Sequence, residues 1–247
     1  ALARQRIADA RGRMLVLALG GTAVGTGLNA HPEFAARTIA GISDHSGCEF
    51  IEAQNHFQAQ ATLGGAVELS GTLRALAVDL VKIANDIRWL ASGPRCGIGD
   101  ITLPALQPGS SIMPGKVNPV LPEAMLQVAA QVMGNDAAIA LAGQGGNFEL
   151  NTMLPVTAYN LLQSIEILAK VVQLFARRCV SGIEADAARC ESYVEQSISL
   201  VTALVPRIGY DRAAAIARKA YESGRTVREV VLAEDLLPPD ELDQILK

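Results

Sequence analysis

Apolar residues recur along two stretches of the chain at alternating steps of four and three positions. The first stretch carries them at Leu69, Leu73, Leu76, Leu80, Ile83, Ile87 and Leu90. The second stretch carries them at Leu154, Ala158, Leu161, Ile165, Leu168, Val172 and Phe175. Because this spacing brings the apolar side chains to one face of an α-helix, both stretches are predicted to form long helices whose apolar faces belong to the core.

The first of these helices is expected to extend upstream of its heptad pattern. Further apolar residues at Phe57, Leu63 and Val67 place its start near Glu52 or Ala53. A helix of about 40 residues would be about 60 Å long, which exceeds the width of a small domain. We therefore expect neighbouring subunits to help cover it.

The N-terminal part of the chain is expected to hold shorter elements. It is predicted to be helical to about Leu19 and to break over Gly20–Gly27, where spaced glycines interrupt any regular pattern. A short helix is predicted over 31–42, with Pro32 in its first turn. Residues 92–107 include five glycines or prolines and are expected to form a loop.

Two more helices are expected in the second half of the chain. One is predicted over 119–142, with Asn118 as its N-cap, and the other over 184–204. Gly143–Asn147 is expected to interrupt the chain before the second heptad helix.

The tail beyond residue 204 is predicted to contain three short helices. Asp211 is expected to be the N-cap of the first helix, and Gly224 is expected to end it. The other two helices are predicted over 226–232 and 239–246.

Composition supports an all-α fold. Half of the residues are hydrophobic but only 4% are aromatic, which favours packed helices over an aromatic-rich β-sandwich. We predict a long-helix bundle domain over 1–204 and a small C-terminal helical domain over 205–247, because long helices give way to short ones near that point. Since the chain opens within a helix and without an N-cap, the bundle domain is expected to be incomplete at its N-terminus.

Charge and cysteine content exclude several classes of partner. The chain has 21 basic and 25 acidic residues, a net charge of −4, and no basic block, so no nucleic-acid partner is expected. No uncharged apolar run reaches the roughly 18 residues that a membrane span needs. The four cysteines form no Cys-x-x-Cys pair, which predicts free thiols in a cytoplasmic protein and no zinc site.

The segment Gly109–Pro119 concentrates the residues that could carry chemistry. It holds two serines, a lysine and an asparagine, flanked by glycine and proline. The next helix would present N–H groups and a partial positive charge beside it, and Lys116 adds a full charge. These features predict an anion site with hydroxyls next to it. The same residue types also suit an ordinary turn in which Asn118 is only a cap, and they leave both interpretations open.

The pattern Gly-Ser-x-x-Met-x-x-Lys-x-Asn over 109–118 resembles the signature of the fumarase/aspartase superfamily. Within that superfamily, nearly the whole chain is most similar to the class II fumarases. The loop with Gly115 resembles the fumarase form, whereas aspartases carry alanine at that place. Further similar stretches lie at 20–29, 82–89, 146–151 and 208–211.

The resemblance implies an enzyme of the tricarboxylic acid cycle that hydrates fumarate reversibly to (S)-malate, without a cofactor or a metal. It also implies a homotetramer whose four subunits pool their long helices into one bundle. Ser110 would be the general base that removes the C3 proton of malate, giving a carbanion stabilised as an aci-carboxylate. A serine hydroxyl is a very weak acid, so positive charge and N–H donors must stabilise its anion.

Other roles in the site are implied in the same way. Glu123 is implied to be catalytic, because the equivalent glutamate of the family pairs with a histidine. The implied substrate-binding residues are Ser111, Lys116, Val117 and Asn118. Lys116 and Asn118 would hold the carboxyl group on which negative charge develops.

Two further motifs of the family are absent from these 247 residues. One is a Ser-Ser-x-Asp-like region that binds carboxylates, and the other is a Thr-His pair linked to proton donation. The histidines His31, His45 and His56 do not follow Gly-x-Thr, so they are expected to have surface or packing roles. The chain is therefore expected to be a fragment that is inactive alone. Two alternatives remain open, an aspartate ammonia-lyase and a noncatalytic helical oligomerisation module.

Overall fold

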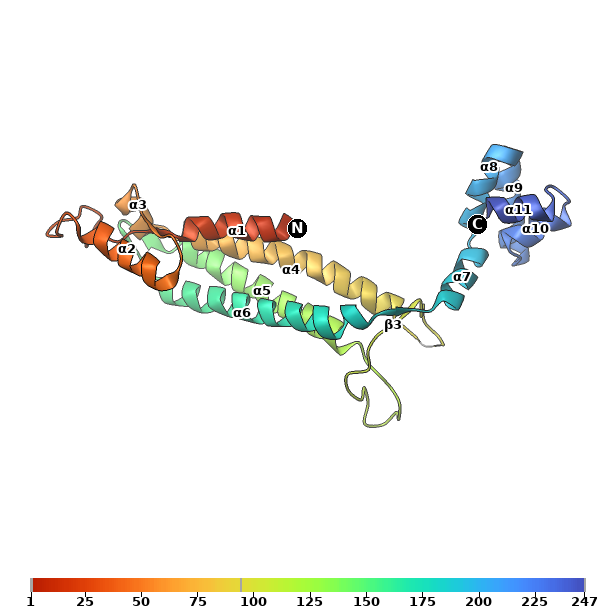
Figure 1. The fold of residues 1–247 in the computed structure, drawn as a ribbon, viewed down its shortest axis with the longest axis horizontal. Coiled ribbons are helices and arrows are strands. Elements are labelled where there is room, and N and C mark those ends of the chain that lie inside the picture. The colour runs from red at the N-terminus through yellow and green to blue at the C-terminus, as the bar shows by residue number, and fades with distance from the viewer. Residues whose placement is uncertain (1, 94, 247) are drawn as a thin grey trace. The chain divides into compact units, whose positions relative to one another are not determined.

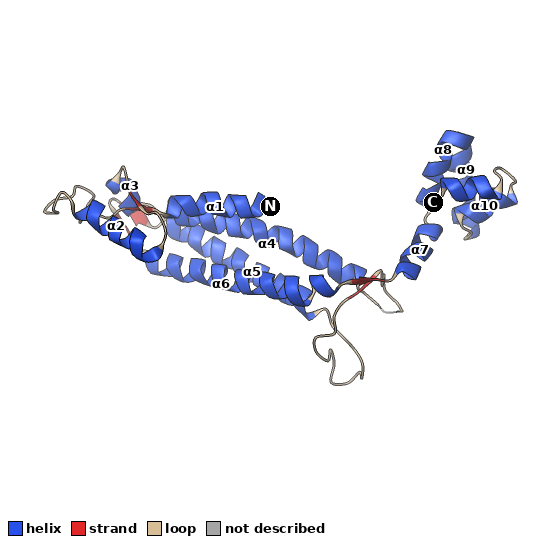
Figure 2. Cartoon of the chain, viewed as in Figure 1, coloured by secondary structure: helices blue, strands red, loops and turns tan. Residues whose placement is uncertain are grey.

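The computed structural model describes residues 2–93 and 95–246, and over these residues the protein is predominantly helical (Figure 2). The predicted all-α fold class is confirmed. Contacts group the chain into two units, residues 1–88 with 103–182 and residues 89–102 with 183–247. Within the described ranges, none of the helices is long and apolar enough to cross a lipid bilayer.

Long helices that lie side by side form the centre of the first unit (Figure 1). They are α4 (Gly64–Leu90), α5 (Val120–Gly143) and α6 (Leu154–Arg178), with the shorter α1 (Leu2–Met14) packed along them. Each long helix contributes to a shared core, for example through Leu73, Met125 and Leu168. Both helices predicted from heptad spacing are therefore present.

The heptad faces are only partly buried within this unit. On α6, Leu161 and Leu168 are buried, but Leu154 is 52% exposed and Ile165 is 41% exposed. The stripe that faces the core also includes the polar residue Ser164. The prediction that the whole apolar face belongs to the core is therefore only half confirmed, because alternate positions of the pattern face outward.

A polar cluster crosses the three long helices. Asp136 of α5 is 4% exposed and accepts hydrogen bonds from Ser70 Oγ and from Arg74 Nη1, both at 2.7 Å. Beside it, Asn135 Nδ2 donates to Ser164 Oγ at 2.9 Å. Because buried polar groups are costly unless they are paired, these bonds restrict which residues of the three helices can face one another.

The first helix ends earlier than predicted. α1 stops at Met14, and β1 (Val16–Leu17) then pairs in parallel with β2 (Ile51–Glu52). The expectation of helix to about Leu19 is wrong, because the backbone groups that would continue the helix are used in this ladder.

The glycine-rich segment 20–27 interrupts regular structure, as predicted, and its turns lead to α2 (Phe34–Ser46). The N–H of Phe34 donates to the carbonyl oxygen of His31 at 2.9 Å, which closes a turn before the helix. Pro32 lies inside that turn, so its predicted place in the first turn of the helix is wrong.

The single helix predicted from about residue 52 to residue 90 is wrong, because it is two helices. α3 (His56–Ala61) is capped by Asn55, whose Oδ1 accepts from the N–H of Gln58 at 3.1 Å. It ends at Thr62, whose backbone is extended with φ −119° and ψ 152°, and α4 begins two residues later. At 1.5 Å per residue α4 alone is about 40 Å long.

Short elements that the sequence did not predict lie between the helices. β4 (Gly146–Asn147) and β5 (Leu150–Asn151) form a hairpin between α5 and α6. In the second unit, β3 (Ile101–Thr102) pairs antiparallel with β6 (Glu184–Ala185). A 3₁₀ turn, η1 (Val180–Gly182), follows α6.

The second unit is built from short helices around its own core. They are α7 (Ala187–Gln196), the 3₁₀ turn η2 (Ile198–Leu200), α8 (Val201–Ile208), α9 (Tyr210–Ser223), α10 (Val227–Ala233) and α11 (Pro239–Ile245). Leu204, Ile216, Val230 and Leu242 are buried in it. The three helices predicted for the tail are α9, α10 and α11.

Two expectations about the helices of this unit are wrong. The helix predicted over 184–204 is interrupted, because β6 takes its first residues and Ser197 is extended with φ −71° and ψ 121°. Asp211 is not the N-cap of α9, since Gly209 occupies that place with φ 80° and Asp211 lies in the first turn. Gly224 ends α9 in the left-handed conformation, as predicted.

The second unit takes in residues 183–204, which the predicted domain boundary after residue 204 assigns to the bundle domain. Residues 183–204 group with the tail, in part because Arg228 of α10 pairs with Glu195 of α7 at 2.8 Å. The assignment of 1–204 and 205–247 as domains stays a prediction.

Candidate active site

The loop Gly109–Pro119 precedes α5 and is closed on itself at Gly109. The N–H of Gly109 donates to the carbonyl oxygen of Lys116 at 2.7 Å. The side-chain Nδ2 of Asn118 donates to the carbonyl oxygen of Gly109 at 3.0 Å. Ser110 follows Gly109 directly, so these two bonds bring together the parts of the loop that carry Ser110, Lys116 and Asn118.

The Ser110 hydroxyl is held by the loop itself. Its Oγ accepts hydrogen bonds from the N–H groups of Ile112, at 3.1 Å, and Met113, at 3.0 Å. N–H donors aimed at an oxygen favour its anionic form, which is what a serine base requires. Serine also uses such bonds to shape ordinary loops, so the geometry permits the chemistry and does not by itself demand it.

The start of α5 differs from the prediction. Asn118 is not a side-chain cap, because its amide is bonded to Gly109, and Pro119 occupies the N-cap position without a side-chain bond. The N–H of Val120 donates to the Asn118 carbonyl and that of Glu123 donates to the Pro119 carbonyl. Pro122, between Val120 and Glu123, has no N–H. The described first turn therefore offers an anion at most one free donor. The positive charge of the site therefore rests mainly on the Lys116 ammonium.

Within residues 2–93 and 95–246, no side-chain hydrogen bond or ion pair joins the remaining predicted site residues to one another. Ser111 and Lys116 are exposed, and Val117 is half exposed. Glu123 lies half-buried in the first turn of α5. Among the described residues, the Glu123 carboxylate forms no hydrogen bond or ion pair, so its implied histidine partner is not found within them.

The three histidines lie outside the loop, and His45 is exposed in the last turn of α2. The Nε2 of His56 is 3.2 Å from both the Leu19 carbonyl oxygen and the Glu52 carboxylate. The Nδ1 of His31 accepts from the N–H of Glu33 at 3.2 Å. These contacts agree with the surface or packing roles expected for His31 and His56, and no hydrogen bond between described residues joins them to the loop.

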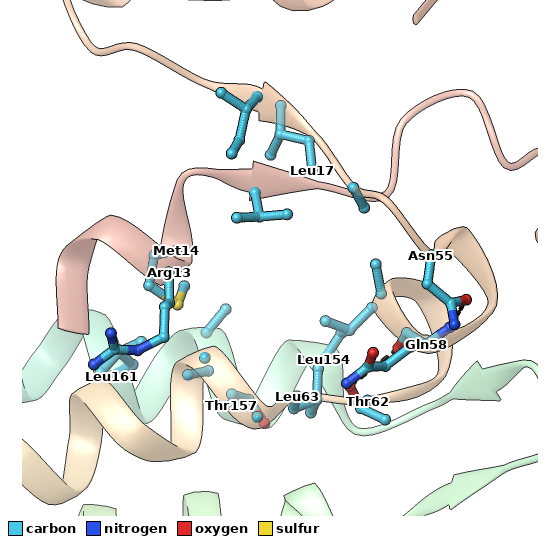
Figure 3. Close-up of a pocket in the computed structure, with 18 of the residues that line it drawn as sticks. Arg13, Met14, Leu17, Asn55, Gln58, Thr62, Leu63, Leu154, Thr157 and Leu161 are labelled. Atoms are coloured by element: carbon cyan, nitrogen blue, oxygen red, sulfur yellow. Dashed lines mark hydrogen bonds between the residues drawn. The ribbon is translucent and has the colours of Figure 1, made fainter. Parts of the chain in front are cut away.

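The first unit also contains a cavity of about 870 Å³. It lies between the end of α1, the β1–β2 ladder, α3 and the first turns of α4 and α6 (Figure 3). Leu17, Asn55, Leu154 and Thr157 are among its lining residues, and none of the predicted site residues is. In the part of the chain that the structure describes, no group of three His, Cys, Asp or Glu side chains could hold a metal ion.

Sequence reasoning missed the contributions of backbone groups. Gly109 and the N–H groups of Ile112 and Met113 shape the loop, but no side-chain chemistry points to them. A serine followed two and three residues later by residues with free N–H groups is a recognised turn pattern, and it could have suggested the bonds to Ser110.

Comparisons with known proteins show what the chain is similar to. Residues 2–134 match the family described as Lyase, and residues 200–247 match the family described as Fumarase C C-terminus. A class II fumarate hydratase from Neisseria meningitidis is 50% identical to this chain and aligns over 98% of it and 52% of its own length. The chain thus spans about half the length of the curated relatives it matches.

Two solved structures resemble the chain closely. The fumarate lyase:delta crystallin from Brucella melitensis bound to cobalt has a TM-score of 0.94 and 47% identity, covering 99% of this chain and 53% of that one. The class II fumarase from Schistosoma mansoni has a TM-score of 0.93 and 35% identity, covering 100% of this chain and 55% of that one. The tail matches the C-terminus of fumarase C, and relatives that are about 50% identical to the chain are class II fumarate hydratases. Because the lyase match spans more than half of the residues, the chain belongs to the lyase family.

Proposed function

We propose that the protein to which this chain belongs interconverts fumarate and (S)-malate by anti addition and removal of water. The observation that carries the proposal is the Ser110 hydroxyl. It receives two N–H donors in a loop that also carries Lys116 and Asn118, within a chain of the lyase family that resembles class II fumarate hydratases. No feature of the site favours another reaction.

In the direction of malate dehydration, the Ser110 alkoxide takes the proton from C3 of malate. The electron pair of that C–H bond moves into the adjacent carboxylate and gives the aci-carboxylate, which carries two negative charges. Lys116 and the amide of Asn118 stabilise this charge where it develops, and Ser111 and Val117 contact the substrate. The pair then forms the C2–C3 double bond as the C2 hydroxyl leaves with a proton from an acid, giving water and fumarate.

The acid and part of the carboxylate site are proposed to come from motifs outside these 247 residues. Glu123 would act through a histidine of such a motif, and neighbouring subunits of a cytoplasmic homotetramer would complete the site. The 247-residue chain alone is therefore expected to show no turnover of fumarate or malate.

The test is the exchange Ser110→Ala in the full-length protein that contains this chain. Loss of a general base typically costs two to four orders of magnitude, so kcat for malate dehydration should fall by about 10²–10⁴. Ser223→Ala, which removes an exposed hydroxyl in α9, is the matched control and should leave kcat unchanged. Unchanged activity of Ser110→Ala would overturn the proposal.

Two additional assays sharpen this result. Offering aspartate beside malate separates hydration from ammonia removal, and release of ammonia as the faster reaction would contradict the proposal. Treatment with a strong chelator is expected to leave activity intact, because the proposed steps use side chains and backbone groups only.

A further inference from the structure

Gly109 has no role in the proposed chemistry, yet both ends of the loop meet at it. Its N–H donates across the loop to the Lys116 carbonyl oxygen, and its own carbonyl oxygen accepts from the Asn118 side-chain amide. A peptide unit bonded on both sides in this way fixes the position of the residue that follows. That residue is Ser110.

The fit around Gly109 leaves no room for a side chain. A Cβ built there would lie 2.9 Å from the Asn118 backbone nitrogen, 2.9 Å from the Lys116 carbonyl oxygen and 3.0 Å from Asn118 Cγ. These distances are shorter than carbon contacts with such atoms allow, and two of the three atoms belong to the backbone. The loop would have to open to admit even a methyl group.

Gly115, in the same loop, is glycine for a different reason. Its φ is +78°, and a Cβ there would meet nothing within 4 Å. Its requirement is therefore conformational, whereas that of Gly109 is steric, because the close approach of two chain segments excludes a side chain. Substitutions at the two positions can therefore test the steric and the conformational requirement separately.

We propose that Gly109 is a positioning residue, which clasps the loop so that the Ser110 hydroxyl is held beside Lys116 and Asn118. The proposal rests on the proposed function of Ser110. We call the two hydrogen bonds of Gly109, with Lys116 and with Asn118, the clasp. The clasp also fixes the loop conformation on which the two N–H bonds to Ser110 Oγ depend. A loosened clasp would leave the serine present but misplaced.

The central experiment is Gly109→Ala in the full-length protein. A displacement of about 1 Å in a reacting group can cost about 100-fold in rate, so kcat should fall by about that factor while KM changes much less. Amide hydrogen exchange of Gly109, Ile112 and Met113 should become faster. The melting temperature should stay near that of the parent, because the loop is not part of the helical core.

Gly41→Ala is the matched control. Gly41 lies in α2, where a Cβ would meet nothing within 4 Å, so the same methyl group should change neither kcat nor loop exchange. Gly115→Asn adds a side chain that tolerates positive φ, and it should keep most of the activity that Gly109→Ala loses. Parent-like kcat in Gly109→Ala, or exchange no faster than in the Gly41→Ala control, would overturn the proposal.

A second variant guards against failure of Gly109→Ala to fold. Asn118→Asp keeps the volume of the side chain but replaces the N–H donor to Gly109 with an acceptor, so the same three amides should exchange faster. Exchange unchanged by this substitution would count against the clasp. Faster exchange in the variant, together with a parent protein that does not hydrate fumarate, would uphold the clasp and overturn the proposed function, so the two failures are distinguishable.

Discussion

The two units of the chain bury their apolar residues in different ways. In the second unit, short helices surround Leu204, Val230 and Leu242, each of which is fully buried. In the first unit, the long helices bury one stripe but leave Leu154 and Leu162 of α6 52% and 65% exposed. Short helices joined by turns can pack around a common core. A long helix that carries apolar residues on more than one side needs a neighbouring helix on each of those sides.

This difference indicates where partners are required. The second unit closes its own core, so its stability should depend on its own packing. The first unit presents an outward apolar face on α6, and contiguous exposed apolar surface of this kind marks interaction sites. The proposed homotetramer would cover that face.

The largest expected effect follows from placing a charge on the outward face of α6. Leu162→Glu in the full-length protein should break the proposed tetramer, because an unpaired buried charge costs about 3–5 kcal/mol. Sedimentation velocity should show smaller species, and activity should fall with them. Tyr221→Glu, at a residue of α9 that is 77% exposed, is the control and should leave the assembly intact. A stable tetramer with Leu162→Glu would contradict the prediction.

The next effect tests whether the second unit stands on its own core. Leu242→Ala should lower the free energy of unfolding of that unit by about 2–5 kcal/mol, as large-to-small changes at buried sites do. Leu232→Ala, at an exposed position of α10, should change it by less than about 0.5 kcal/mol. Urea unfolding followed by circular dichroism measures both. Equal effects of the two variants would mean that the core of this unit has been wrongly identified.

A smaller effect is expected at the start of α10. Thr226 Oγ1 accepts from the N–H of Glu229, and the Glu229 carboxylate accepts from the N–H of Thr226, which forms a capping box. Thr226→Ala should lower the free energy of unfolding by about 1 kcal/mol, and Thr226→Ser should retain most of it. The same urea titration distinguishes them, and equal stability of the two variants would exclude a role for the cap.

The smallest effect concerns thiol reactivity and changes no fold. Cys179 is buried at the end of the first unit's core, whereas Cys96 is exposed. Burial raises the pKa of the Cys179 thiol, so its thiolate fraction stays low at neutral pH and increases only at higher pH. Iodoacetamide labelling followed by mass spectrometry should modify Cys96 at least about tenfold faster than Cys179. Equal rates would show that this end of the core opens readily.

The site, like the fold, could be predicted from the sequence only in part. Residue type and spacing identified the loop that holds Ser110, Lys116 and Asn118, because the motif is contiguous in the sequence. The same reasoning misplaced Asn118 as a helix cap. Its amide has two possible partners, the N–H groups of the helix and the carbonyl of Gly109, and only the folded loop shows that it takes the second.

By itself, the sequence determined the helical character of the chain, its long and short helices and its relationship to the fumarases. These properties depend on residues that are close in sequence, through the period of the helix and through contiguous motifs. The tertiary structure alone decided where α1 ends, how the heptad faces divide between buried and exposed, and why Gly109 must be glycine. Each of these depends on a contact between segments that are apart in sequence, such as β1 with β2 or Gly109 with Asn118, and local residue patterns do not specify such contacts.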